Sequence, residues 1–103
     1  MIIKKGVNVN GVQPETIVGM LLTREVLKKA GIDMVVTSIT DGKHRANSLH
    51  YAGLAFDIRT WEMPTREMQE TIAQRLRVAL GDEWDVVIEE THIHIEFDPE
   101  IRA

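Results

Sequence analysis

The sequence predicts one α+β domain over residues 1–103, in which a small, mostly antiparallel sheet is covered by two helices. Two observations support this fold class. Two segments have apolar residues at close to helical spacing, and four shorter segments are rich in β-branched residues or alternate apolar with polar ones. The elements follow the order αββαββ, and the last two strands are adjacent. A chain of 103 residues is long enough for one modest core.

The two helices are expected at 14–30 and 64–80. Pro14 and Glu15 occupy the first turn of the first helix, and Gly31 follows its end, the arrangement that flanks many helices. The second helix begins at Pro64 and is stopped at Gly81 in the same way. Apolar residues recur through the first helix at near-helical spacing, namely Ile17, Val18, Leu21, Leu22, Val26 and Leu27.

Four strands are expected, at 33–39, 54–59, 84–88 and 92–97, with a polar loop over 40–47. Side chains alternate between the two faces of a strand, so alternation assigns each residue to a face. In 54–59 the large apolar residues alternate with Ala55, Asp57 and Arg59. In the last strand, Ile93, Ile95 and Phe97 share the core face, while the other face carries His92, His94 and Glu96.

Composition excludes several partner classes. The formal net charge of −4 and the lack of a basic stripe argue against nucleic acid. The sequence contains no run of 18 consecutive apolar residues, the length needed to span a membrane. The apolar stretch behind the N-terminal lysines is too short for a signal peptide. We therefore expect a protein that is cytoplasmic as synthesised and monomeric. The chain has no cysteine, so a metal would have to be held by His, Asp or Glu.

Three of the four histidines lie in two short segments, SLHYAGLAFDIR at 48–59 and EETHIHIEF at 89–97. A single histidine on a strand is usually structural. Two histidines on one strand face, together with His50 and Asp57, favour a metal site instead. Catalytic zinc sites have three protein ligands and leave a fourth position for water. His50, Asp57 and one of the two strand histidines supply such a set.

Residues 48–57 resemble the S-x-H-x-x-G-x-A-x-D signature of zinc peptidases that cut peptidoglycan peptides, and residues 89–94 resemble their second signature, E-x-x-H-x-H. This superfamily includes D-Ala-D-Ala carboxypeptidases and dipeptidases and the L-alanyl-D-glutamate endopeptidases of bacteriophages. The signalling domain of hedgehog proteins shares the fold. SLHY at 48–51, followed by G, D and I and preceded by DG-x-H at 41–44, is particularly close to the hedgehog version. The resemblance spans 35–97 and implies a hedgehog/D-Ala-D-Ala peptidase-like fold.

The resemblance implies that zinc binds to His50, Asp57 and His94, and that Glu89 is the catalytic base. Glu90 competes with Glu89 as the base, because strict alternation along the last strand would place Glu90 on the histidine face. His92 would stabilise the oxyanion without binding the metal. The exchange of roles between the two strand histidines stays open.

Residues that bind substrate are less well defined by the sequence. The carboxypeptidases of the superfamily often carry an Arg before the first zinc ligand to hold a substrate carboxylate, and residues 37–43 contain none. Cations close by could replace it. Ser48 is expected to brace its turn, and His44 corresponds to a second histidine of the hedgehog version. The candidates for substrate binding are therefore Lys43, His44, Arg45, Ser48 and Arg59.

The leading functional prediction is a zinc metallopeptidase that hydrolyses peptidoglycan stem peptides, as an L-Ala-D-Glu endopeptidase or a D-Ala-D-Ala carboxypeptidase. Such an enzyme would be endolysin-like and phage-derived, and would reach the cell wall after lysis or as part of a phage particle. Two alternatives remain. One is a hedgehog-like module that binds zinc without turnover, and the other is a cytoplasmic D-Ala-D-Ala dipeptidase.

Overall fold

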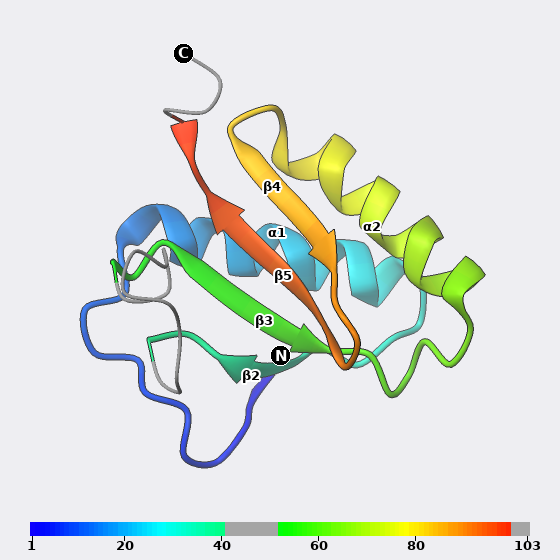
Figure 1. Cartoon of the computed structure of the whole chain (residues 1–103), viewed down its shortest axis with the longest axis horizontal. Helices are drawn as coiled ribbons and strands as arrows, with labels where there is room; N and C mark the ends of the chain where they lie inside the picture. Colours follow the sequence, from blue (N-terminus) through cyan, green and yellow to red (C-terminus); the bar gives the residue numbers. More distant parts are fainter. Residues whose placement is uncertain (41–51, 100–103) are drawn as a thin grey trace.

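The structure is a computed structural model, and it describes residues 1–40 and 52–99 (Figure 1). Two helices and a five-stranded sheet make up this part of the chain, as the sequence predicts for an α+β domain. In chain order the elements are β1 (Ile2–Ile3), α1 (Pro14–Lys29), β2 (Val35–Ser38), β3 (Ala55–Arg59), α2 (Arg66–Leu80), β4 (Trp84–Ile88) and β5 (His92–Phe97). Neither helix is long and apolar enough to cross a membrane.

The helix ends follow the signals in the sequence. Pro14 is in the first turn of α1, and Gly31, just past its end, has a φ of 72°. α2 starts two residues later than predicted because Thr65 is its N-cap, and the Thr65 side chain accepts a hydrogen bond of 3.1 Å from the backbone N–H of Met68. Gly81 ends α2 with a φ of 92°, in the left-handed region that glycine tolerates.

The sheet has the strand order β1-β2-β3-β5-β4. β1 pairs with β2 in parallel, and all the other neighbours are antiparallel. The strands β4 and β5 have the predicted bounds. β1 was not predicted, because a strand of two residues is too short to show alternation.

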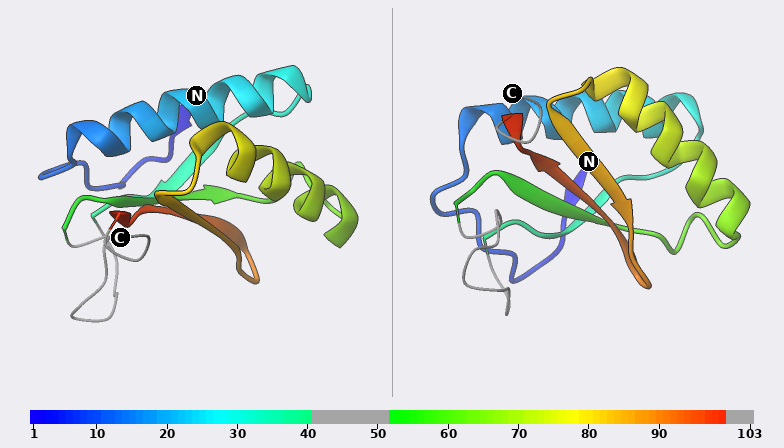
Figure 2. Two further views of the ribbon diagram at one scale, coloured as in Figure 1. Left: turned by 90° about the horizontal axis from the view of Figure 1, so that it is seen from above. Right: turned by 45° about the horizontal axis from the view of Figure 1, so that its top comes forward.

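Both helices lie on the same face of the sheet, as the two views in Figure 2 show. That face is the core, where Phe56 and Ile58 of β3 and Ile93 and Ile95 of β5 are fully buried. The side chains between them on β3 and β5 therefore point to the other face, which neither helix covers. Asp57, His92 and His94 are on this face.

α1 buries only the C-terminal part of its apolar pattern, where Leu27 is in the core and Val26 packs against it. Its buried residues include Thr16, Gly19 and Thr23, whereas four large aliphatic residues are exposed. Close packing explains the choice at Gly19, since an added Cβ there would lie 2.2 Å from a carbon of the Trp84 indole. The exposed aliphatic residues of α1 are Ile17, Val18, Leu21 and Leu22.

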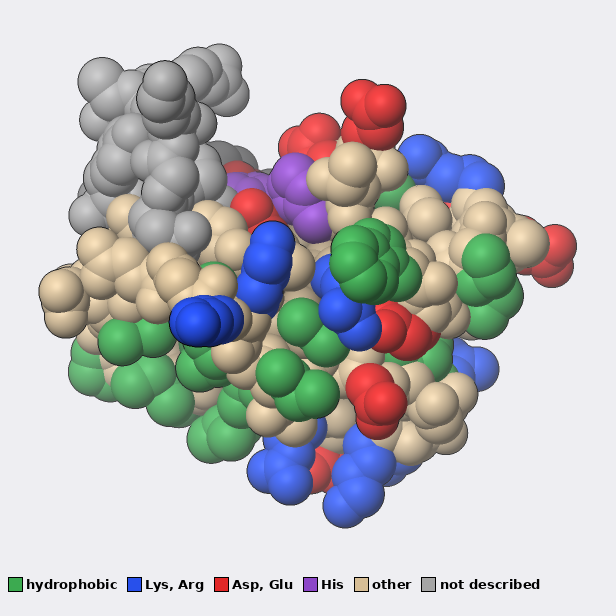
Figure 3. Space-filling view, turned by 90° about the horizontal axis from the view of Figure 1, so that it is seen from below, with side chains coloured by type: hydrophobic (Ala, Val, Ile, Leu, Met, Phe, Trp, Pro, Cys, Tyr) green, Lys and Arg blue, Asp and Glu red, His purple; other side chains and the backbone are tan. Residues whose placement is uncertain are grey.

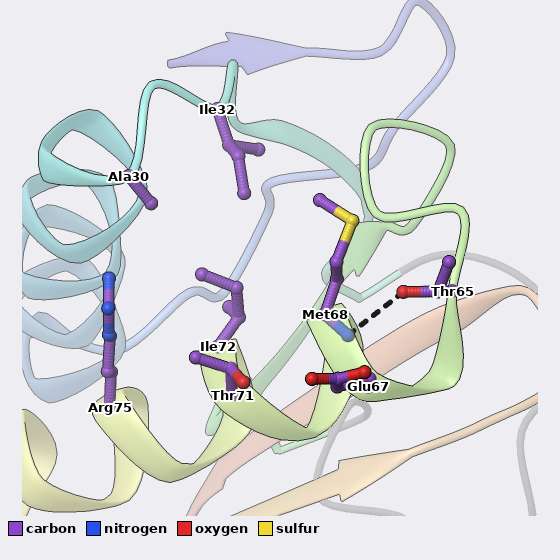
Figure 4. Close-up of a pocket in the computed structure, with 8 residues that line it drawn as sticks. All are labelled: Ala30, Ile32, Thr65, Glu67, Met68, Thr71, Ile72 and Arg75. Atoms are coloured by element: carbon purple, nitrogen blue, oxygen red, sulfur yellow. Dashed lines mark hydrogen bonds between the residues drawn. The ribbon is translucent and has the colours of Figure 1, made fainter.

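A shallow groove of about 380 Å³ lies between the end of α1 and the first half of α2 (Figure 4). Ile32, Met68 and Ile72 give it an apolar lining, and the charged residues Glu67 and Arg75 also line it. The groove is formed by the helical layer, on the other side of the sheet from Asp57 and His94. It is therefore separate from the residues to which the sequence assigns chemistry.

Gly53 connects the start of β3 to the start of α1. Its carbonyl accepts hydrogen bonds from the backbone N–H of Gln13 (3.0 Å) and from Thr16 Oγ1 (2.7 Å). Its φ is 73°, and an added Cβ would lie 2.0 Å from the carbonyl oxygen of Gly11. The glycine of the first signature therefore has a structural role: it lets the chain pass close to the 11–13 segment just before β3.

We expect Gly53→Ala to destabilise the fold much more than Gly31→Ala. Both glycines have nearly the same positive φ, but nothing lies within 4 Å of a Cβ at Gly31. Gly31→Ala should therefore cost about 1 kcal/mol from the backbone conformation alone. The clash with a backbone oxygen should raise the cost at Gly53 to about 3 kcal/mol or more. Denaturant unfolding of the two variants measures both costs, and equal losses would contradict the close approach.

Candidate active site

β3 and β5 place Asp57 directly opposite His94, as partners in an antiparallel ladder. Residues opposite one another in such a ladder share a face and are close enough for their side chains to interact. His94 Nδ1 lies 3.0 Å from Asp57 Oδ1. The side chains are 19% and 8% exposed, so the pair is largely withdrawn from solvent. Both residues were predicted from the sequence to belong to one metal site, and the strand register brings them together.

His92 lies two ladder pairs further along, opposite Arg59. His92 Nε2 is 3.6 Å from Asp57 Oδ2, and Nδ1 is 3.1 Å from Thr91 Oγ1. Each oxygen of the carboxylate thus faces one histidine, and His94 is the closer and more buried of the two. Figure 3 shows the histidine side chains next to acidic ones on this side of the molecule.

The β4–β5 turn determines which glutamate shares the face of the histidines. Ile88 pairs with Ile93, and the backbone N–H of Glu89 donates to the carbonyl of His92 at 2.8 Å. The ladder therefore continues for one more pair, and Glu89 is opposite His92 on the polar face. Glu90 would share the face of the histidines only if β5 extended back to residue 90. The chain instead reverses at residues 90 and 91, and the reversal places Glu89 with the histidines.

The local charge favours a cation at His94. Burial lowers the pKa of this imidazole, but the hydrogen bond to Asp57 and the negative charges of Asp57, Glu96 and Glu89 raise it. The net pKa is above the ordinary value of 6.5. A field that stabilises a proton on the ring also stabilises a metal cation in its place, provided that the proton leaves when the metal binds.

The Asp57–His94 pair fits zinc in donor type and in spacing. Zinc binds His nitrogen and Asp oxygen at about 2.0–2.2 Å, so two donors of one tetrahedral site are about 3.3 Å apart. The observed separation of 3.0 Å is close to that value. The other ring nitrogen of His94, Nε2, lies 3.4 Å from Glu96 Oε1. A carboxylate in this position fixes the tautomer and orientation of a metal-binding histidine.

Five of the predicted site residues lie outside the described residues. Among residues 1–40 and 52–99, no group of three His, Asp or Glu side chains is placed to hold a metal ion. The described residues thus contain two of the three ligands that the resemblance implies. The residues without a structural description are Lys43, His44, Arg45, Ser48 and the third ligand, His50.

Arg59 is on the face of the histidines, but its guanidinium already has partners. It forms a salt bridge with Glu62, and this hydrogen-bonded partner holds the pKa of the Glu62 carboxyl below its usual value, although burial opposes the effect. The guanidinium also stacks on Trp61, 4.3 Å from the ring centroid. Trp61 is 76% exposed.

Sequence reasoning did not assign a role to Glu96 or to Trp61. The alternation of β5 already placed Glu96 on the face of the histidines, and that signal was sufficient to include it in the site. Trp61 lies just after β3, where no periodicity assigns a side chain to a face. Its position next to Arg59 follows from the turn that leaves the strand, and the sequence carries no signal for it.

A comparison with known protein families supports the fold. The family model of the Hedgehog amino-terminal signalling domain matches residues 17–96, which is most of the chain. The matched region contains most of α1, all of α2, the Asp57–His94 pair and Glu89. The chain belongs to the Hedgehog amino-terminal signalling domain family. No curated protein and no solved structure matches it significantly.

Proposed function

We propose that this chain is a zinc-dependent peptidase that hydrolyses amide bonds in the stem peptides of peptidoglycan. The observation that carries the proposal is the Asp57–His94 pair, whose facing atoms are 3.0 Å apart, with Glu89 on the same sheet face. The two signatures in the sequence, read as those of the peptidoglycan peptidases, supply the substrate class.

The metal would be held by Asp57, His94 and His50. Two neutral imidazoles and one carboxylate leave the ion with a net positive charge, and the charge lowers the pKa of a bound water to about 7 and polarises a carbonyl group. Glu96 would accept the Nε2–H of His94 and so keep Nδ1 free to bind. Metal affinity would then depend on residues of β3, β5 and the 41–51 segment together.

Glu89 is the proposed general base. From its position opposite His92 it would take a proton from the attacking water and return it to the leaving amine. His92, when protonated, would donate a hydrogen bond to the oxyanion that forms on the substrate carbonyl. Its Nε2 lies 3.6 Å from Asp57 Oδ2, so the ring is held beside the carboxylate of the proposed metal site.

Basic side chains next to the proposed metal site would bind the carboxylates of the substrate. Arg59 is the described candidate, and its guanidinium would have to share its hydrogen bonds between Glu62 and a substrate. Lys43, His44 and Arg45 are the other candidates, and Ser48 would brace the segment that carries His50. We propose that the enzyme is endolysin-like and that it reaches the wall by lysis or on a phage particle.

A second candidate function follows from the family match, since the matching family is a signalling domain. The chain would then bind zinc for stability or recognition, without turnover. Zinc sites with only a structural role usually have four protein ligands and no open position. The acidic Glu89 on the face of the histidines favours the peptidase.

Digestion of purified peptidoglycan and of its soluble stem peptides tests the proposal. Mass spectrometry of the products should show new L-Ala and D-Glu termini for the endopeptidase, or release of terminal D-Ala for the carboxypeptidase. D-Ala-D-Ala is included as a third substrate, because cleavage of this dipeptide alone would indicate the cytoplasmic dipeptidase. A zinc-loaded protein that cleaves none of the three would leave the binding module as the better account.

We expect Glu96→Gln to weaken zinc binding by about 10–100-fold, the usual range for a residue that orients a metal ligand. The glutamine side chain lacks the negative charge that orients the His94 ring, but the three proposed zinc ligands are unchanged. Competition with a chelator measures the affinity. Glu90→Gln is the matched control, because Glu90 is exposed in the turn and should leave the affinity unchanged. Equal affinities in the two variants would remove Glu96 from the site.

A further inference from the structure

The outer side of α1 carries a continuous apolar surface that no described element covers. Ile17, Val18, Leu21 and Leu22 are 46%, 55%, 46% and 39% exposed. These four residues, called here the α1 patch, form two adjacent rows with a spacing of four residues. In the left view of Figure 2, α1 lies on the sheet with no described helix or strand beyond it. Soluble proteins rarely expose such a cluster unless it binds something.

The residues on the buried side of α1 explain why the α1 patch faces outward. The side that faces the sheet has the small or polar residues Thr16, Gly19 and Thr23 beside Met20 and Leu27, and Gly19 leaves room for the Trp84 ring. Rotating the helix to bury the α1 patch would replace this glycine by a larger side chain against the indole. The helix is therefore held with its aliphatic residues outward.

The charges on α1 are arranged for a second copy of the same helix. Glu15 is in the first turn, whereas Lys28 and Lys29 are in the last. Arg24 and Glu25 lie between the α1 patch and the last turn, so the second half of the helix keeps a net positive charge. Two α1 helices packed antiparallel would bring the acidic first turn of each towards the basic end of the other. Their helix dipoles would also be opposed, which is the favourable arrangement.

We propose that the α1 patch is the interface of a homodimer with two-fold symmetry, in which two α1 helices pack antiparallel. A two-fold interface uses the same surface on both copies and must be self-complementary, as the α1 patch and its flanking charges are. Rows with a spacing of four residues interdigitate well in helix pairs. The interface lies on the helical side of the molecule, so both copies of the Asp57–His94 face stay open. The proposal differs from the monomer expected from the sequence, and it does not depend on the proposed function.

Sedimentation of the wild-type chain over a range of concentrations tests the dimer. We expect a mass that rises from that of one chain to that of two by a concentration on the order of 100 µM, since one helix pair gives a small interface. Leu21→Lys should raise the dissociation constant by at least about 10-fold, because it places charge in the centre of the interface. Val78→Lys is the matched control on α2, where Val78 is 76% exposed, and it should dimerise like the wild type.

A charge swap tests the antiparallel arrangement. Glu15→Lys should weaken the dimer, and the further changes Lys28→Glu and Lys29→Glu should restore it. Circular dichroism confirms that each variant stays folded, which is expected because all the altered side chains are exposed. A wild type that sediments as a single chain at every concentration overturns the dimer, and so does a Leu21→Lys variant that dimerises like the wild type. Failure of the charge swap to restore association overturns the antiparallel pairing.

Discussion

Asp57→Ala and His94→Ala should each abolish stoichiometric zinc binding. The two side chains are ladder partners with their facing atoms 3.0 Å apart, so each variant would remove one of three proposed ligands. The loss of zinc affinity should exceed the range of about 10–100-fold that is usual for residues that hydrogen-bond to a metal ligand. Metal analysis after dialysis should show about one zinc per chain in the wild type and little in either variant.

Zinc should also raise the thermal stability of the wild type, but not that of Asp57→Ala or His94→Ala. A ligand at 100 times its dissociation constant stabilises the folded state by about 2.7 kcal/mol, and the two variants should lose this increment. His50→Ala should behave in the same way, although His50 lies outside the described residues. Full zinc retention in His94→Ala, with loss in His92→Ala, would exchange the roles of the two histidines. Full retention in Asp57→Ala would contradict the site.

Glu89→Gln should lower kcat by about 100-fold or more and leave both zinc content and fold unchanged. That reduction is the usual scale for a positioned general acid or base. The amide keeps the size of the side chain and cannot accept the proton. Because the backbone of Glu89 stays paired with His92, the turn between β4 and β5 should be preserved. Turnover on a stem peptide, measured alongside zinc content, separates loss of the base from loss of the metal.

Glu90→Gln is the matched control for Glu89→Gln, since both glutamates are exposed at the same turn and only Glu89 continues the ladder. We expect it to keep nearly full activity. An inactive Glu90→Gln with an active Glu89→Gln would mean that the substrate approaches from the other side of the turn. His92→Ala should lower kcat by about 100-fold or more with zinc still bound, if its ring is a principal donor to the oxyanion.

The fold was largely predictable because its signals are local. Pro14, Thr65 and the glycines at 31 and 81 bound the two helices, and β4 and β5 have the expected bounds. The alternation of β5 placed the two histidines on one face, where they are found. The strand β1 was missed because it has only two residues, and its pairing with β2 is a long-range contact.

The site was predictable only as far as single strands determine it. Which glutamate lies beside His92 depends on where the chain reverses, and counting along one strand gave Glu90 as a competitor although the ladder places Glu89 there. The exposed side of α1 depends on Trp84, which is far away in the sequence and packs against Gly19. Helical spacing alone identifies an apolar side, but it does not determine whether the sheet or a partner covers it.

Titration of zinc into the metal-free protein, with binding and stem-peptide hydrolysis followed in the same sample, tests the central claim most directly. The account predicts that hydrolysis is absent without metal, rises in proportion to bound zinc and stops rising at one zinc per chain. Full occupancy without hydrolysis of any stem-peptide bond would contradict it, and so would hydrolysis that does not depend on zinc.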